Sequence, residues 1–410
     1  MVRPAHHVPK ALILFFFLFL MPVAHAIGPR SVTDGKVVKW PSMPVTVHLE
    51  TDLDVRGKSV SALVSAALQE WVTPSESNVT FTEGSLGAAV NDSNVCNFLY
   101  DSSACPSGPT NDGTNPLIID DDGEIIADFF GSGNKFTTLG FASIITFNSS
   151  SGAAVKGEAV FNASCLNGVE LSGCLTAGSG GKPLSFSDND FTSFIVHEIG
   201  HFLGLDHSQV NLKEATDNDS SNDNLITTMF PTFIVGNGAN FKTPERDDKI
   251  GLAQLYPSGS FSSTFWTLSG TVFKANGTTE LQCANLVARS TTDPKGDAVA
   301  ALSGDFAEAG IADGSYTIPG LQTGVSYTID LEPIGSGFTA ASGYTPCRGG
   351  SSGESSPPSF TALTSSKSFS GSAGETVTVD CTVGDDCTGS SSSSTAPTTS
   401  SGSGGCSLIP

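Results

Sequence analysis

The chain has 410 residues, which is too many for one ordinary core, so two domains with tails are expected. Only 15% of its residues are charged and 45 are glycine, a composition that favours strands and loops over long surface helices. The formal charge of −22 opposes binding to nucleic acid or to anionic membrane, and suits a solvated extracellular protein.

Residues 1–26 are predicted to be a secretory signal peptide. Arg3 and Lys10 give a positive start, residues 11–20 form an apolar run, and the tripeptide at 24–26 is a small-x-small cleavage site. A membrane anchor is the alternative, but the run is too short to span a bilayer comfortably. Removal of the signal leaves 17 basic and 41 acidic residues, a formal charge of −24. No later stretch is long and apolar enough to cross a membrane, so we expect a secreted protein.

Nine cysteines fit an oxidising compartment. Connectivity cannot be derived from sequence, but closeness along the chain suggests three pairs: Cys96 with Cys105, Cys165 with Cys174, and Cys381 with Cys387. Cys283 and Cys347 would then pair, and Cys406 would be left over. No C-x-x-C spacing occurs, which argues against zinc bound through cysteine.

The first elements along the chain are a strand, a helix and a second strand. Apolar and polar residues alternate over residues 45–50, which predicts a half-buried strand. From Val60 to Trp71 the apolar residues follow the spacing of one wide helical stripe, which predicts an amphipathic helix. Residues 78–83 then have the composition of a second strand.

Residues 84–116 are rich in Ser, Asn, Gly and Pro and contain two cysteines, so we expect a long stapled loop. Residues 139–148 and 156–164 are predicted to be further strands. Between loop and strands, Asp120 and Asp122 match a fragment of the EF-hand pattern without the rest of it. A calcium loop and a solvated acidic turn are both compatible with this fragment.

The segment that follows is predicted to be a helix with an N-cap at Ser187 or Asp188. His197 and His201 are four residues apart in it, so both rings project from one face at a separation that suits zinc. Glu198 follows the first histidine and is long enough to reach a zinc-bound water and take its proton.

Gly204, three residues after His201, allows the helix to end in a sharp turn because glycine tolerates a positive φ. The turn would return His207 as a third ligand. Three protein ligands leave a fourth position for water, which is the arrangement of a catalytic zinc site. A satisfied core histidine is the alternative for any one of these residues, but not for the whole pattern.

The stretch "HEIGHFLGLDH" resembles the long zinc signature of metzincin metallopeptidases, H-E-x-x-H-x-x-G-x-x-H. The resemblance implies zinc ligation by His197, His201 and His207, and a methionine turn downstream. Met229 in "TTMFPTF", 22 residues after His207, matches that turn. This implies that Met229 packs beneath the zinc as an apolar floor without ligating it, whereas a gap-filling core methionine is the alternative.

Over residues 37–257 the chain is most similar to the matrixin branch of the metzincins. The matching segments are 66–71, 79–83, Ser208 after the third histidine, the Met-turn and pocket wall at 229–233, and the closing helix at 246–257 with Asp247 and Asp248. Residues 156–162 resemble the edge strand that pairs with an extended substrate, which implies β-augmentation in a protease cleft.

Three departures from the matrixin pattern carry expectations. The short segment between the signal and the first strand has no cysteine, so latency through a propeptide cysteine is not expected. His48 is the one further histidine after the signal, so a second, structural zinc is not expected. Insertions around residues 96–105 and at 211–224 leave the rim of the cleft unpredicted.

Residues 258–266 have the composition of a linker, and residues 267–383 are predicted to be an all-β sandwich. Its expected strands are 268–273, 284–290, 314–321, 325–333 and 375–383. This pattern resembles carboxypeptidase regulatory-like, transthyretin-like domains, which implies a stabilising, spacing or surface-binding role without catalysis. Residues 384–410 are Ser, Thr and Gly-rich and predicted to be disordered. The tail is compatible both with attachment to a surface near Cys406 and with an ordinary disordered chain end.

The whole pattern predicts an α+β metzincin-type catalytic domain at 27–257, with a twisted mixed sheet and an active-site helix, followed by the sandwich. We expect a secreted, monomeric zinc endopeptidase with one catalytic Zn²⁺ and polypeptide substrates, in which Glu198 is the general base. It would have no nucleic-acid partner and no membrane span. The alternatives are a surface-binding protein with a degenerate protease domain and a zinc hydrolase acting on non-peptide substrates.

Overall fold

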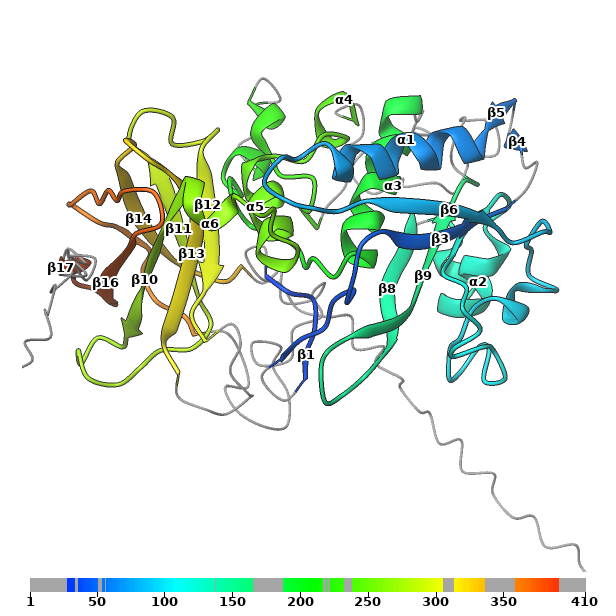
Figure 1. The fold of residues 1–410 in the computed structure, drawn as a ribbon, viewed down its shortest axis with the longest axis horizontal. Helices are drawn as coiled ribbons and strands as arrows, with labels where there is room; N and C mark the ends of the chain where they lie inside the picture. The colour runs from blue at the N-terminus through cyan, green and yellow to red at the C-terminus, as the bar shows by residue number, and fades with distance from the viewer. Residues whose placement is uncertain are drawn as a thin grey trace, which may run out of the picture.

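The computed structural model describes residues 28–33, 36–50, 54–55, 57–136, 138–164, 187–216, 219, 222–231, 238–304, 313–335 and 358–390. Within them, a mixed α/β unit is followed by a unit of β-sheets (Figure 1). The helices are α1 (Val60–Val72), α2 (Glu124–Phe130), α3 (Asp188–Phe202), α4 (Gly238–Phe241), α5 (Arg246–Leu255) and α6 (Phe261–Thr264). The 3₁₀ turns are Val95–Asn97, Ser132–Asn134, Glu214–Thr216 and Asp223–Leu225, and two small hairpins pair β1 (Val32–Thr33) with β2 (Lys36–Val37) and β4 (Asp54–Val55) with β5 (Lys58–Ser59).

The first unit is built on a five-stranded sheet with the strand order β6-β3-β7-β9-β8. Its strands are β3 (Val45–Leu49), β6 (Phe81–Ser85), β7 (Pro116–Asp120), β8 (Gly140–Phe147) and β9 (Ala154–Asn162). β3 is parallel to β6 and β7, β7 is parallel to β9, and β8 is antiparallel to β9. This mixed sheet with few helices confirms the α+β expectation.

The position of β9 corrects one prediction. Residues 156–162 were expected to form the edge strand, but β9 lies between β7 and β8, and β8 is the edge. The two charged residues of this inner strand, Lys156 and Glu158, are each only 1% exposed. They are buried because Lys156 Nζ lies 3.0 Å from the Asp112 carboxylate and 3.8 Å from that of Glu158, and Glu158 also accepts the Tyr100 N–H.

Both faces of this sheet are covered. Leu117 and Ile119 of β7 belong to the core cluster that includes α1 and α3, whereas Ile118 between them belongs to a cluster formed with α2 and the loop 84–116. That loop carries the expected Cys96–Cys105 disulfide. The alternation explains why β7 reads as a continuous apolar run without periodicity, as strands buried on both faces do.

The second unit consists of two four-stranded sheets. One has the order β13-β10-β16-β17 and the other β12-β11-β14-β15. The strands are β10 (Phe265–Phe273), β11 (Ala284–Ser290), β12 (Ala298–Leu302), β13 (Ser315–Gln322), β14 (Tyr327–Pro333), β15 (Leu363–Thr364), β16 (Thr376–Thr382) and β17 (Thr388–Ser390). β10 and β16 are parallel, with Leu268 opposite Val377. Apolar residues of both sheets form one cluster, and the five expected strands are all present. The type of this domain stays a prediction.

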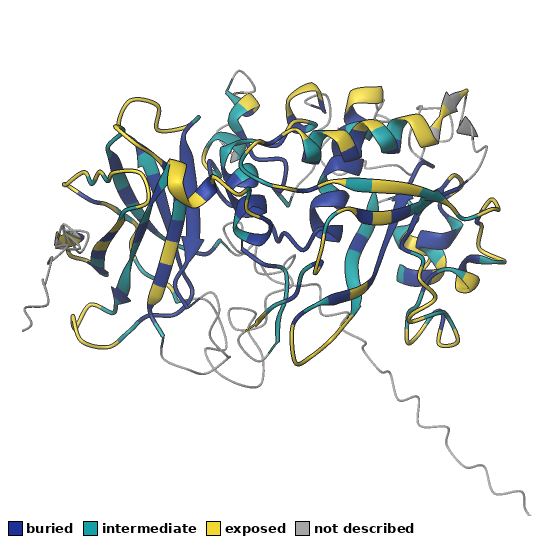
Figure 2. Cartoon of the chain, in the orientation of Figure 1, coloured by how far each residue is buried: buried dark blue, intermediate teal, exposed yellow. Residues whose placement is uncertain are grey.

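Two boundaries differ from the sequence-based expectation. Residues 258–266 were expected to be a linker, but they contain α6 and the start of β10, and Trp266 is fully buried. The sheet also extends beyond residue 383, because β17 pairs with β16 and the expected Cys381–Cys387 disulfide lies beside it. Figure 2 shows that buried residues continue from the first unit through α5 into the second.

Several predictions fall on residues outside the described ranges: the signal peptide, the Cys165–Cys174 pair, Cys347, and the tail from residue 391 with Cys406. Cys283 is disulfide-bonded. None of the helices in the described ranges combines the length and apolarity needed to span a bilayer.

Burial of Glu50, just after β3, makes the stability of the first unit depend on pH. Burial raises the pKa of this carboxyl from 4.5 to about 8. The folded protein therefore keeps the proton in a range where the unfolded chain releases it. We expect the free energy of unfolding to fall as pH rises from about 5 to about 8, by at most about 1.4 kcal/mol per pH unit from this group.

Denaturant unfolding at both ends of that pH range checks this expectation. Glu50→Gln should make the dependence less steep, although Glu158, whose pKa burial also raises to about 8, still contributes, and the matched change at the exposed Glu83 should leave it unchanged. Equal pH dependence in wild type and Glu50→Gln would show that the Glu50 carboxyl does not titrate in this way.

Candidate metal centre

Helix α3 carries the first part of the candidate site and is fixed at its N-terminus. Ser187 is the N-cap, as one of the two predicted caps, and it forms a capping box with Asp190. The carboxylate of Asp190 accepts the N–H and the hydroxyl of Ser187 at 2.9 and 2.6 Å. The buried face of α3 packs on β8, β9 and α1, and Trp71 of α1 donates its indole N–H to the Val196 carbonyl at 2.8 Å.

The chain turns sharply after α3, as the glycine predicted. Gly204 has a φ of 94°, and its N–H bonds to the His201 carbonyl at 3.0 Å. The next N–H, of Leu205, bonds back to the Gly200 carbonyl at 2.9 Å. These bonds close the helix end and direct the following residues back toward its histidine face.

The turn brings the three predicted histidines together. Ligand atoms of His197, His201 and His207 all lie within 4.8 Å of one another, and these residues form a group that could hold a metal ion. The Nε2 atoms of His201 and His207 are 3.1 Å apart. Two nitrogens bound to one tetrahedral zinc would be separated by about 3.3 Å, so the donor set and its spacing fit this ion.

Two of the rings are oriented by backbone carbonyls. His197 Nδ1 lies 2.8 Å from the Thr228 carbonyl oxygen, and His201 Nδ1 lies 2.8 Å from that of Leu205. Donation from each Nδ1–H leaves Nε2 as the free lone pair, which is the tautomer that a metal requires. Burial lowers the pKa of His197 to about 4 and moves the pKa values of His201 and His207 in the same direction, so all three imidazoles are neutral.

Glu198 is 8% exposed and lies on α3 beside the first histidine. Burial raises the pKa of its carboxyl to about 7, and the positive charge of Arg30 offsets part of the rise. A divalent ion beside it would favour the carboxylate further. The group is thus suited to take a proton near neutral pH.

Met229 lies under the helix, where the resemblance placed it. It is fully buried, and a side-chain carbon on Gly200 would collide with its sulfur. The carboxylate of Asp248 holds the turn by accepting the N–H groups of Thr228 and Met229 at 2.8 and 3.1 Å. Since Thr228 also orients His197, the turn supports both the floor of the site and one ligand.

Replacing Gly200 with alanine is expected to lower stability by about 1–3 kcal/mol or more, because the new carbon must displace Met229 and approach Trp71 Cζ2 at 2.9 Å. Thermal unfolding with and without zinc would measure the loss. Gly133→Ala is the control, because nothing lies within 4 Å of its added carbon. An unchanged melting temperature for Gly200→Ala would contradict the tight packing.

Sequence reasoning missed the role of the residues just after the expected signal peptide. The N–H of Arg30 donates to the Gly204 carbonyl at 2.7 Å, and the Asp206 N–H donates to the Gly28 carbonyl at 3.1 Å. The guanidinium of Arg30 interacts electrostatically with Asp206 and Glu198. No motif marks this arginine, so only its position in the fold identifies it.

The acidic turn for which calcium was one alternative, and the further histidine His48, make other contacts. Asp120 accepts the N–H groups of Gly123 and Ile126 at 2.9 and 2.8 Å, and Asp122 accepts that of Glu124 at 3.0 Å. These carboxylates hold the start of α2, so the described residues do not show a calcium site. His48 Nδ1 accepts the Asn115 N–H at 3.0 Å and thus links β3 to the start of β7.

Comparison with known proteins agrees with this geometry. A family model described as matrixin matches residues 39–257, which is more than half of the chain. A search of curated proteins found no match.

Proposed function

The chain belongs to the matrixin family, and on this premise we propose that it is a secreted zinc-dependent endopeptidase that hydrolyses peptide bonds in extracellular proteins. The observation that carries the proposal is the grouping of three neutral histidines, two of them buried and one half-buried, around one point, with Glu198 beside the first of them. His197, His201 and His207 would hold the ion through Nε2.

In the proposed mechanism Glu198 is the general base. Zinc, when bound, supplies Lewis acidity to the scissile carbonyl and to the attacking water. Glu198 takes a proton from that water and then delivers it to the leaving amine, so one carboxyl serves as base and acid in turn. Helix α3 fixes the carboxyl relative to His197 and His201, because the three residues lie within about one helical turn.

An extended polypeptide suits the surroundings of the site. β8 is the edge strand of the sheet and packs against α3. Its outer N–H and C=O groups can pair with an added strand, so we propose that the substrate binds here by β-augmentation. This replaces β9 as the strand that meets the substrate, and it supports polypeptides over non-peptide substrates.

The remaining proposals concern the second unit and the location of the protein. The two-sheet unit would be a regulatory-like sandwich without catalytic residues, and the disulfides Cys96–Cys105 and Cys381–Cys387 are consistent with an extracellular location. Attachment through the tail and a monomeric state are part of the proposal. A catalytically inactive surface-binding protein is not favoured, because the ligands and the base are all in place.

Cleavage of a peptide library by the purified full chain tests the function. We expect cleavage that a chelator abolishes and added zinc restores, with the pattern of products giving the side-chain preference. Intact zinc loading of a folded protein that cleaves no polypeptide would reject the endopeptidase and favour the binding protein.

A further inference from the structure

Helix α5 is buried against both units of the chain. Leu252 and Leu255 belong to the core cluster of the first unit, whereas Ile250 and Ala253 belong to the cluster between the two sheets of the second. One short helix therefore contributes to two cores, and the two units share it as a structural element.

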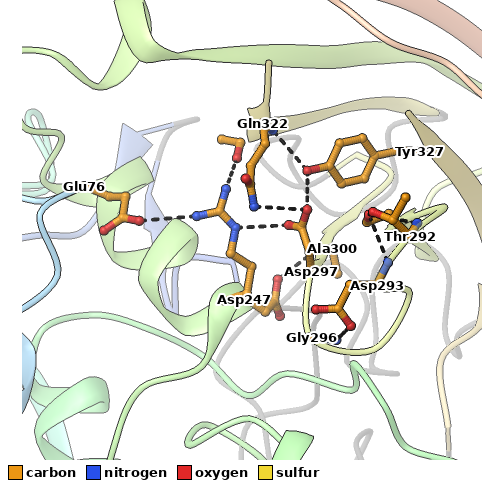
Figure 3. A network of polar contacts seen from close by, with 12 residues as sticks. Glu76, Asp247, Thr292, Asp293, Gly296, Asp297, Ala300, Gln322 and Tyr327 are labelled. Atoms are coloured by element: carbon orange, nitrogen blue, oxygen red, sulfur yellow. Dashed lines mark hydrogen bonds and ion pairs between the residues drawn. The ribbon is translucent and has the colours of Figure 1, made fainter. Parts of the chain in front are cut away.

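Polar contacts at the start of α5 also join the units. Arg246 Nε lies 3.2 Å from the Asp297 carboxylate of the second unit, and Nη1 lies 3.3 Å from Glu76 of the first. Asp297 in turn accepts hydrogen bonds from the Tyr327 hydroxyl at 2.6 Å and the Gln322 amide at 3.2 Å (Figure 3). Because these groups are largely shielded from water, the contacts favour one fixed arrangement of the units.

Asp247, the next residue, connects the second unit to the segment after α3 that carries His207. One carboxylate oxygen accepts the N–H of Ala300 in β12 at 2.8 Å, and the other accepts the hydroxyl of Ser208 at 2.6 Å. Ser208 directly follows His207, and its own N–H bonds to the Met229 carbonyl at 3.0 Å. β12 is an edge strand, so this N–H points outward to the carboxylate instead of to another strand.

Apolar packing follows the same route. Apolar residues that follow His207 share one buried cluster with residues of β11 and β12. The cluster includes Val210, Ile226, Phe230 and Phe241 from the first unit and Val287, Ala298, Ala300 and Leu302 from the second. Asn211 adds polar contacts, because its side chain bonds to the Lys295 carbonyl at 3.0 Å and to Arg289 at 2.8 Å. The described residues between His207 and Met229 thus contact the second unit.

We propose that the second unit is a working part of the metal centre: through Ala300 and the positioning residue Asp247 it fixes the loop that carries His207, so zinc affinity and turnover depend on it. The inference rests on the proposed zinc site at His207. It differs from the expected role of the sandwich as a spacer, since a spacer would leave the metal centre unaffected by changes in β12.

The test uses full-length Ala300→Pro, which removes the N–H that Asp247 accepts. Proline is tolerated on edge strands where the N–H faces outward. We expect the zinc dissociation constant, measured by competition with a chromophoric chelator, to rise about 10-fold, as after loss of an outer-shell partner. The absorption spectrum of the Co²⁺-loaded protein should change as well, because it reports ligand geometry.

Asp297→Asn is the matched control. It weakens the same interface at Arg246 but leaves the contacts of Asp247 in place. Its zinc affinity and Co²⁺ spectrum should equal those of the wild type, even where its melting temperature is lower. A folded Ala300→Pro with unchanged zinc affinity, or an equal loss in Asp297→Asn, would overturn the proposal.

Hydrogen exchange on the unaltered protein gives a second measurement that does not depend on the fold of a variant. Coupling between two sites is reciprocal, so zinc should slow exchange in β12 and leave β17 unchanged. Zinc binding without any effect on β12 would overturn the inference while leaving the proposed function intact. Absence of zinc binding in the wild type would instead reject the proposed function and the inference with it.

Discussion

Replacing Glu198 with alanine is expected to lower kcat/KM by about 10²–10⁴-fold while zinc remains bound. A positioned general acid–base contributes rate factors of this size, and alanine leaves the three histidines in place. Metal content by atomic absorption and cleavage of the best library peptide, measured on the same preparation, give the two readouts.

The result separates catalysis from metal binding. Glu198→Gln is a further variant of nearly equal volume, and it should be similarly inactive because an amide cannot accept the proton. Near-normal activity in either variant would show that another group activates the water. Loss of zinc together with activity would mean that the carboxylate helps to hold the ion.

Replacing His201 with alanine, unlike replacing Glu198, is expected to lower the metal content of the protein. His201 is 4% exposed, and its Nε2 is the donor atom next to that of His207. Loss of a direct ligand should weaken zinc binding by more than the 10–100-fold typical of losing an outer-shell partner, and activity should fall to background at ordinary zinc concentrations.

Thermal unfolding gives an independent measure of the same loss. Zinc at 100 times its dissociation constant stabilises a folded protein by about 2.7 kcal/mol, and His201→Ala should lose this gain. His48→Ala is the control: it removes a histidine outside the cluster, so it should keep one zinc per chain and the zinc-dependent rise in melting temperature. A second zinc lost in this control would contradict the expectation of a single metal site.

The metal centre was predictable because its geometry is local. A spacing of four residues places His197 and His201 on one helical face, and a glycine with a φ of 94° ends the helix before His207. The five expected strands of the second unit were predictable for a similar reason, because turn residues in the sequence mark where each strand begins and ends.

The features that could not be predicted from the sequence depend on contacts between segments that are distant along the chain. Residues 156–162 contain two charges, and only the fold reveals that Asp112 and Tyr100 compensate them inside the sheet. β12 is a short run of apolar residues with no motif. Only the fold shows that its Ala300 N–H donates to the carboxylate of Asp247 in α5. Arg30 has no motif, because the neighbours that define its role are far along the chain.

The pairing of β10 with β16 bears on the order in which the parts of the fold can form. β10 contains Leu268, and its parallel partner residue is Val377, so the two strands can pair only after residue 377 has been made. Pairings this distant in sequence form slowly. Under the proposal that the second unit fixes the segment carrying His207, the metal site would be completed only after this pairing has formed.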